Sequence, residues 1–345
     1  MTLTERLERT GIRRRGSKKS GFHYVRADGS PVSAADRARI EALRIPPAWR
    51  DVAVHPSPNG TLQAVGRDAA GRWQYRYHPS HEARRERNKY TRLLAFAEAL
   101  PQMRRALARD LARPGLPREK VLACALRLLS CCFLRPGSAR YAAENESFGV
   151  ATLRRRHVSV EGWVVRLDFP GKSGKRQMRE LEDKQVASIV RRLASEPGEV
   201  FKYRGENGEW VDVRRRDINA YIQETMDGRF SAKDFRTWAG TVSAASELRQ
   251  LGPVDSETEF KKNLVAAVKA TAQSLGNTPA VCRKSYIHPA VIEAYLDGSL
   301  IPKLNERKSK PSSTSSCRLR PDETAVLRFL KRASNGRKKH ARPAH

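Results

Sequence analysis

The chain has 345 residues, of which 67 are Lys or Arg and 37 are Asp or Glu, so its formal net charge is +30. Hydrophobic residues make up 39% of it, which is enough to build a core and excludes a wholly disordered basic polypeptide. No apolar run is long enough to cross a membrane, and no apolar stretch follows the basic N-terminus, so we expect neither a membrane span nor a secretory signal.

The first part of the chain predicts a small domain built mainly on an antiparallel sheet. Short runs suited to strands alternate with turn signals between about residues 21 and 81. Residues 62–65 and 73–77 predict a hairpin, and Ser33 is a suitable N-cap for a short helix over residues 34–43. We expect residues 1–83 to form this domain, with the first 20 residues frayed in part.

Residues 84–89 are highly charged and have little to bury, so we expect a linker there. From residue 90 to 302, apolar residues recur mostly at helical spacing, for example within 118–134. A pair of strands, residues 157–169 and 177–181, interrupts the helices. The sequence therefore predicts an α+β protein, in which a mainly helical domain with a small β hairpin follows the sheet domain.

Residues 303–345 form a basic C-terminal tail, in which 13 Lys or Arg and 3 Asp or Glu give a net charge of +10. We expect a linker over residues 308–316, a short helix over 322–333 and a loose end after it. The first 302 residues carry the remaining +20, so the folded body is basic as well. Such a chain favours a nucleic acid as its partner, because binding to phosphates releases counterions.

The cysteines and histidines predict neither a disulfide framework nor a metal site. The five cysteines are odd in number and form no CxxC pair, which is typical of reduced, buried thiols in a cytoplasmic protein. The eight histidines show neither HxxxH nor HExxH spacing. We therefore expect no metal ion and no small-molecule cofactor.

Four short segments combine residue types suited to phosphoryl transfer. In chain order they are residues 134–137 (LRPG), the turn 171–175 (GKSGK), residues 233–238 (KDFRTW), and residues 275–278 (LGNT) with Tyr286 after them. Each is weak alone, since an Arg near a helix end is more often a surface charge and a lone Tyr is more often half-buried packing. Their order and spacing together favour a catalytic set.

Two longer motifs resemble those of the type IB DNA topoisomerases, in the short poxvirus-like form found in bacteria. Residues 71–77 (GRWQYRY) resemble the family's G-R-x-Q-Y-x-Y hairpin, and residues 144–153 (ENESFGVATL) resemble its E-N-E-x-x-G-x-x-T-L run. The resemblance extends from about Phe22 to about Leu300, and the four segments occur in the family's order.

The resemblance implies a catalytic set and a DNA-binding set. The catalytic residues would be the nucleophile Tyr286, with Arg135, Lys172, Arg236 and Asn277, the last of which stands where many members of the family carry His. The DNA-binding residues would be Arg72, Gln74, Tyr75, Tyr77 and Lys233. Without the resemblance, the hairpin would be an amphipathic strand with both tyrosines on its packed face.

The chemistry of these residue types agrees with strand cleavage. A tyrosine–phosphate ester conserves the energy of the DNA bond, so the strand can be resealed without ATP. Two guanidinium groups can neutralise the non-bridging oxygens in the transition state, so no Mg²⁺ is needed. Lys172, or alternatively Lys175 in the same turn, can protonate the departing 5′ oxygen. Asn277 can donate a hydrogen bond but cannot exchange a proton.

We therefore expect an enzyme that relaxes supercoiled DNA by transient cleavage of one strand, a 3′-phosphotyrosyl intermediate, strand rotation and religation. The resemblance implies two domains that clamp double-stranded DNA, and we expect a monomer in the cytoplasm, associated with the nucleoid. One alternative is a tyrosine recombinase, but recombinases usually carry HxxR where residues 233–236 read KxxR. Another is a non-catalytic nucleic-acid-binding protein in which Tyr286 only packs.

Overall fold

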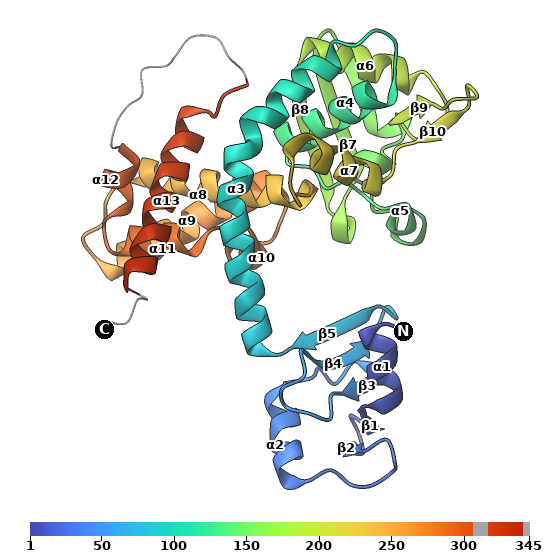
Figure 1. The fold of residues 1–345 in the computed structure, drawn as a ribbon, viewed down its shortest axis with the longest axis vertical. Coiled ribbons are helices and arrows are strands. Elements are labelled where there is room, and N and C mark those ends of the chain that lie inside the picture. The colour runs from blue at the N-terminus through green and yellow to red at the C-terminus, as the bar shows by residue number, and fades with distance from the viewer. Residues whose placement is uncertain (306–316, 341–345) are drawn as a thin grey trace. The chain divides into compact units, whose positions relative to one another are not determined.

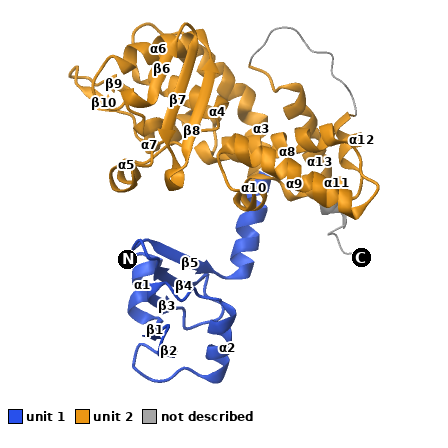
Figure 2. Ribbon diagram, turned by 180° about the vertical axis from the view of Figure 1, so that it is seen from behind, with its two compact units in different colours: residues 1–91 blue, residues 92–345 orange. Residues whose placement is uncertain are grey.

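The computed structural model describes residues 1–305 and 317–340, with side chains as far as Asn335 in the last helix. The chain divides into two units, Met1–Thr91 and Arg92–His345 (Figure 1 and Figure 2). The first is built on an antiparallel sheet, and the second is mainly helical with smaller sheets, which confirms the predicted α+β class. No helix in these described segments is long and apolar enough to span a membrane.

The sheet of the first unit has five strands in the order β2-β1-β3-β4-β5, and all neighbours are antiparallel. The strands are β1 (Ile12–Ser17), β2 (Gly21–Val25), β3 (Arg50–Val54), β4 (Leu62–Arg67) and β5 (Trp73–Tyr77). Strands β4 and β5 form the predicted hairpin, and β5 is an edge strand.

Side-chain alternation gives this sheet two apolar faces, each covered by one helix. On one face, Leu7 of α1 (Leu3–Thr10) packs with Ala53 and Val65. On the other, Ile40 of α2 (Ala34–Ala42) packs with Val52. The small unit therefore has its core on both sides of the sheet.

Two N-caps decide where these helices begin. Ser33 caps α2 as predicted, since its Oγ accepts the Asp36 N–H at 3.0 Å. The expectation of a frayed N-terminus is wrong, because α1 begins with a capping box. Thr2 Oγ1 accepts the Glu5 N–H at 3.2 Å, and Glu5 Oε2 accepts the Thr2 N–H at 2.8 Å. This T-x-x-E spacing is a readable signal for the start of a helix.

Helix α3 (Pro79–Leu111) runs through residues 84–89, where we expect a linker, and the division between the two units falls within it. The run is largely exposed, but five of its six residues are Arg, Glu or Lys, which are strong helix formers. The scarcity of apolar residues here therefore reflects an exposed part of a helix and not an irregular connection.

The larger unit contains a three-stranded antiparallel sheet where the sequence predicts two strands. Its strands are β6 (Val158–Glu161), β7 (Val164–Pro170) and β8 (Arg176–Glu182), in that order. The first predicted strand is divided because Gly162 takes a left-handed conformation, with φ 53°, and turns the chain. A separate two-stranded ribbon consists of β9 (Lys202–Arg204) and β10 (Trp210–Asp212).

The helices of the larger unit form two groups (Figure 1). Lying with the sheets are α4 (Arg118–Cys131), α5 (Ala139–Asn145), α6 (Lys184–Ala194) and α7 (Arg215–Met226). The other group comprises α8 (Ala232–Leu251), α9 (Glu257–Leu275), α10 (Pro279–Tyr286), α11 (Pro289–Leu296), α12 (Leu300–Asn305) and α13 (Pro321–His340). Helix α4 ends before residue 134 because Phe133 has a left-handed φ of 54°.

The cysteines follow the burial pattern of their helices. All five are free thiols, and Cys124, Cys132 and Cys282 are buried, as expected. Cys131 is exposed, contrary to the expectation, because it lies on the solvent side of the last turn of α4.

Helix α13 is longer than the predicted segment 322–333 and is packed into the larger unit. Phe329 and Leu330 are 2% and 1% exposed. Glu323 accepts two hydrogen bonds from Arg104 of α3, at 2.8 and 2.9 Å, and one from Trp238 Nε1 of α8 at 3.4 Å. The C-terminal segment is therefore anchored on two other helices. The predicted linker 308–316 and residues 341–345 lie outside the described residues.

Glu323→Ala tests this anchor. The change leaves Arg104 Nη2 and the Trp238 N–H without their acceptor, so we expect the free energy of unfolding to fall by about 2–4 kcal/mol. Urea denaturation followed by circular dichroism measures it. The matched control is Glu257→Ala, in an exposed pair with Lys261, where the loss should stay below about 1 kcal/mol. Equal losses for the two variants would contradict the anchoring role.

Candidate active site

Four of the side chains singled out in the sequence converge in the larger unit. Arg135 Nη2 donates to Asn277 Oδ1 at 2.5 Å, although the two residues are 142 positions apart. The guanidinium carbon of Arg236 lies 5.2 Å from the centre of the Tyr286 ring. Arg135 is near enough for its charge to act on both Arg236 and Tyr286. Two guanidinium groups, a carboxamide and a phenol therefore border one region.

Helix α8 carries Arg236 into the interior, where this residue is only 2% exposed. One terminal nitrogen donates to the carbonyl of Phe133, and the other donates to the carbonyl of Leu275 at 2.7 Å. These carbonyls belong to the segments that carry Arg135 and Asn277. Arg236 therefore interacts with the other members of the site in two ways, by hydrogen bonds to the main chain of their segments and by its charge.

Close packing of α10 on α8 sets the position of Tyr286. A Cβ at Gly240 would lie 2.8 Å from the Tyr286 carbonyl oxygen and 2.9 Å from its Cβ, so a larger side chain does not fit. Thr241 Oγ1 lies 3.2 Å from the same carbonyl and accepts the His288 N–H at 3.2 Å. Because Gly240 follows Arg236 by four residues, both lie on one face of α8.

The ENESFGVATL run, residues 144–153, holds the backbone of Arg135. The Val150 N–H donates to the Arg135 carbonyl at 2.9 Å. A Cβ at Gly149 would lie 2.6 Å from that carbonyl, so the close approach requires glycine. The left-handed Phe133 turns the chain at the end of α4, directly ahead of this contact. The motif therefore contributes to the site by placing Arg135.

Asn277 lies between the end of α9 and the start of α10. Gly276 ends α9 in the left-handed conformation, with φ 60° and ψ 43°, as glycine at this place predicts. Thr278 caps α10, since its Oγ1 accepts the Val281 N–H at 3.4 Å. Both neighbours of Asn277 are thus fixed by helix ends.

Burial and positive charge oppose each other at this site. Burial alone would raise the pKa of Tyr286, but the guanidinium of Arg236, together with Arg135 and Lys233, lowers it below its ordinary value. Burial, with the charge of Arg135, lowers the pKa of Arg236 to about 10. That pKa still leaves Arg236 a cation at neutral pH, so the site favours a phenolate or another bound anion.

Two buried N–H groups of the site have no hydrogen-bond partner among the described residues. They are Arg236 Nε and Asn277 Nδ2. Leaving a buried polar group unpaired costs about 1–3 kcal/mol, so such groups are few in folded proteins. Together with the local charge, they indicate the place of a hydrogen-bond acceptor such as a phosphate oxygen.

Lys172 and Lys175 do not join this cluster. Both are exposed in the turn between β7 and β8, which contains a short 3₁₀ helix over Lys172–Gly174. Neither side chain contacts the four converging groups in the described structure, so the choice between the two lysines stays open. Lys233, by contrast, lies in the first turn of α8 and is near enough to influence the pKa of Tyr286.

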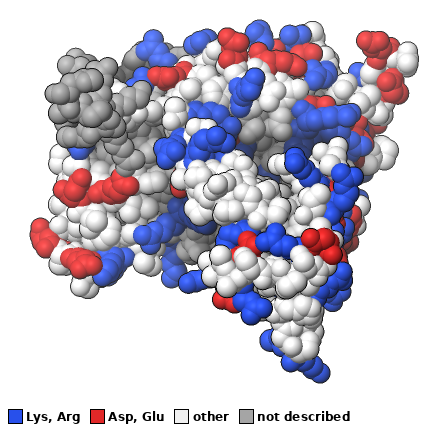
Figure 3. Space-filling model, turned by 60° about the horizontal axis from the view of Figure 1, so that its bottom comes forward, with Lys and Arg blue, Asp and Glu red and all other residues white. Residues whose placement is uncertain are grey.

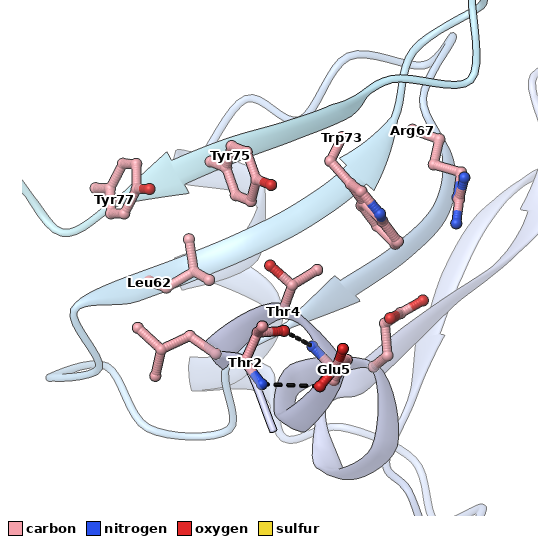
Figure 4. A pocket seen from close by; sticks show the side chains of 10 residues that line it. Thr2, Thr4, Glu5, Leu62, Arg67, Trp73, Tyr75 and Tyr77 are labelled. Atoms are coloured by element: carbon pink, nitrogen blue, oxygen red, sulfur yellow. Dashed lines mark hydrogen bonds between the residues drawn. The ribbon is translucent and has the colours of Figure 1, made fainter. Parts of the chain in front are cut away.

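The predicted DNA-binding residues of the smaller unit lie on both faces of β5. Tyr75 and Tyr77, with ring centres 6.1 Å apart, share one face with Trp73 and line an open pocket of about 600 Å³ beside the start of α1 (Figure 4). By alternation Gln74 points to the other face, where it donates to Asp68 Oδ2 at 2.9 Å. One flat surface of the strand therefore cannot present all of these residues.

Asp68 organises the turn of this hairpin. Its Oδ2 accepts a hydrogen bond from Arg72 Nε at 2.9 Å, and its Oδ1 accepts the Arg72 N–H at 3.0 Å. Tyr77 packs against the core of the unit, whereas Tyr75 is 40% exposed. The hairpin thus combines features of a packed amphipathic strand with an exposed ring and basic groups.

Basic side chains are spread over the face drawn in Figure 3, between smaller groups of acidic ones. Such a surface suits a polyanion. In the segments that the structure describes, no group of three or more His, Cys, Asp or Glu side chains could hold a metal ion.

Sequence reasoning missed three residues that shape the site, namely Gly240, Thr241 and Arg179. Gly240 carries a signal, because glycine inside a helix costs about 1 kcal/mol relative to alanine and so indicates a packing requirement. Thr241 and Arg179 carry none, since the contacts by which they reach the site are with main-chain carbonyls of distant segments.

Two family models match the chain. Residues 78–312 match the catalytic core of eukaryotic DNA topoisomerase I. Residues 21–68 match the N-terminal domain of bacterial DNA topoisomerase IB. Together they cover parts of both structural units.

Several viral and cellular proteins are similar to the chain. It is 35% identical to DNA topoisomerase 1B of Acanthamoeba polyphaga mimivirus, over 86% of this chain and 90% of that protein. It is 21% identical to DNA topoisomerase 1B of Vaccinia virus, over 79% of this chain and 86% of the viral protein. With DNA topoisomerase 1 of Schizosaccharomyces pombe the identity is 28%, over 47% of this chain and 19% of that protein. These matches confirm the resemblance in the motifs, and the chain belongs to the type IB DNA topoisomerases.

Proposed function

We propose that this topoisomerase relaxes supercoiled double-stranded DNA through a 3′-phosphotyrosyl intermediate on Tyr286. Arg135, Arg236 and Asn277 hold the scissile phosphate, and Lys172 protonates the departing 5′ oxygen, with Lys175 as the alternative. The observation that carries the assignments of Arg135, Arg236, Asn277 and Tyr286 is the convergence of their side chains, two of which hold buried donors without a partner. The lysine assignment rests on the resemblance in the turn 171–175.

The reaction begins when Tyr286 Oη attacks the phosphorus. The lowered pKa of the phenol favours loss of its proton to solvent, which produces the stronger nucleophile. The new bond between phosphorus and Tyr286 forms as the bond to the 5′ oxygen breaks. That oxygen takes a proton from the ammonium group of Lys172.

The developing charge on the phosphate meets donors that are already fixed. Arg236 spends two of its five N–H hydrogens on the carbonyls of Phe133 and Leu275, which leaves Nε and one hydrogen on each terminal nitrogen. These bonds restrict the freedom of Arg236 but hold its guanidinium in place before the substrate arrives. Preorganised donors of this kind need no rearrangement during the reaction.

Exchange of one ester for another allows the strand to rotate and then be resealed. The end with the free 5′ hydroxyl turns about the intact strand, and reversal of the attack restores the DNA without ATP. One site on one chain performs both steps, so we propose that a monomer acts on DNA of the nucleoid in the cytoplasm.

Neither alternative function is favoured. A tyrosine recombinase would use the same residue types, but the family matches are to topoisomerases and residues 233–236 read KxxR. A non-catalytic DNA-binding protein is disfavoured because the family matches are to enzymes.

Relaxation of plasmid DNA tests the function as a whole. We expect the protein to relax both positively and negatively supercoiled plasmid in EDTA and without ATP, because two arginines supply the charge that a metal ion would supply. Gel electrophoresis resolves the topoisomers, and Tyr286→Phe is the inactive control. An absolute requirement for Mg²⁺ would contradict the proposed chemistry.

Tyr286→Phe tests the nucleophile. The variant keeps the aromatic ring but lacks the oxygen, so it should bind duplex DNA and form no covalent adduct after quenching in denaturant. Gel shift and denaturing electrophoresis measure the two properties. Tyr141→Phe, at an exposed position of α5, should form the adduct normally. An adduct formed by Tyr286→Phe would assign the nucleophile to another residue.

Asn277 is tested by two replacements. Asn277→Ala removes one neutral donor, so we expect cleavage to slow by about 100-fold to 1,000-fold without being abolished. Asn277→Asp keeps an acceptor for Arg135 but removes the Nδ2 donor and adds a negative charge beside the phosphate, so it should be at least as slow. Single-turnover cleavage rates provide the comparison. Wild-type rates for Asn277→Asp would eliminate the donor role.

A further inference from the structure

Arg179 lies on the inward face of strand β8. In the sheet it pairs with Leu167 of β7, and two positions before it Gln177 pairs with Phe169. Leu167 and Phe169 are 2% and 3% exposed, so this face of the sheet is the buried one. A guanidinium group in such a place needs partners for its donors.

The Arg179 guanidinium joins the two segments that carry the active site. Its Nε donates to the carbonyl of Cys132 at 3.2 Å, and its Nη2 donates to the carbonyl of Ser274 at 3.1 Å. The next carbonyls along each segment, those of Phe133 and Leu275, accept hydrogen bonds from Arg236. Two arginines from different elements therefore bridge the same segments at successive carbonyls.

The carbonyls of Ser274 and Leu275 end α9, and those of Cys132 and Phe133 directly follow the last residue of α4. The last carbonyls of a helix have no partner within it and carry partial negative charge, so they are suitable acceptors for a cation. Arg179 and Arg236 together satisfy such groups on both helices. Arg135 and Asn277 follow these two helix ends within a few residues.

A second contact from β8 reaches the same place. Gln177 Oε1 accepts a hydrogen bond from Arg179 Nη2 at 3.3 Å. A Cβ at Gly276 would lie 2.4 Å from this oxygen, so Gln177 packs directly against the residue before Asn277. Strand β8 therefore supports the end of α9 through two neighbouring side chains.

No carboxylate in the described segments acts on the charge of Arg179, whose partners are carbonyl and carboxamide oxygens. The side chain also contributes to lowering the pKa of Arg135 and of Arg236. A third cation is thus kept beside two others, and only uncharged oxygens compensate its burial.

We propose that Arg179 is a positioning residue for the transesterification, and that it holds the segments of Arg135 and Asn277 at the separation at which both reach one phosphate. The inference rests on the proposed function. Arg179 acts through the main chain, and its hydrogen bonds are directed at carbonyls and Gln177. Misplacement by about 1 Å can slow a reaction by about 100-fold, so loss of this bridge should affect the chemical step.

The test measures formation of the covalent adduct in a single turnover. Enzyme is in excess over a duplex whose short downstream strand dissociates after cleavage, so that resealing does not interfere. The variants are Arg179→Gln and Arg179→Lys. The matched control is Arg191→Gln, because Arg191 also donates to a carbonyl, that of Gly162 at 2.7 Å, and carries the same charge. Affinity for the duplex is measured in a Tyr286→Phe background.

We expect Arg179→Gln to slow adduct formation by about 10-fold to 100-fold, with an unchanged Kd for the duplex and a normal rate for Arg191→Gln. Arg179→Lys should not restore the rate, because an ammonium group cannot span two carbonyls as the planar guanidinium does. In the double variant with Asn277→Ala, the cleavage rate should fall by clearly less than the product of the two separate fold-losses, because Arg179 acts partly through Asn277.

A wild-type rate for Arg179→Gln would overturn the proposal. Full rescue by Arg179→Lys would also overturn it, because charge alone would then suffice, and so would independent effects with Asn277→Ala. Thermal unfolding shows whether Arg179→Gln is folded. If it is not, the rate of Arg179→Lys alone tests the proposal. Failure of the proposed function would give a different result, because the wild-type enzyme itself would then form no adduct. Failure of the Arg179 proposal alone would give a normal wild-type rate and an equally normal rate for Arg179→Gln.

Discussion

The site depends on the burial of the Arg236 guanidinium against two main-chain carbonyls. A buried cation is costly unless polar groups surround it, and here the carbonyls of Phe133 and Leu275 supply them. Because the Leu275 carbonyl ends α9 and the Phe133 carbonyl directly follows the end of α4, one side chain fixes the ends of two helices relative to each other. Arg135 and Asn277 take their positions from these ends, and Tyr286 packs beside the same arginine. The arrangement of the site and the stability of this part of the fold are therefore not separable.

Local signals account for the parts of the fold that the sequence predicts. Ser33 caps α2, Gly276 ends α9 and the alternation of apolar residues marks β7, and each of these effects acts over a few residues. Residues 84–89 differ from the prediction because charge reports exposure and does not distinguish an exposed helix from a loop. The capping box at Thr2 was equally local and could have been read from the sequence.

The candidate site is only partly predictable for a different reason. Motifs named Arg135, Arg236, Asn277 and Tyr286, and the structure brings these four together. The bonds that hold them in place end on main-chain carbonyls, which every residue possesses, so no residue type marks the acceptors. Arg179 could not be predicted from the sequence for the same reason, since its acceptors in the two segments are main-chain carbonyls. Lys172 illustrates a further limit, since a turn exposes its side chain and no described contact fixes where the ammonium group points.

Helix α13 lies beyond the region that matches the family catalytic core, although it packs on that region. The matched region ends at residue 312, whereas the buried Phe329 and Leu330 and the carboxylate that binds Trp238 all come later in the chain. Trp238 follows Arg236 by two residues on the same helix. A protein shortened to the matched region would thus lose part of the apolar covering of the helix that carries Arg236 and would expose an apolar surface. Comparisons of minimal cores across relatives should therefore retain this additional helix.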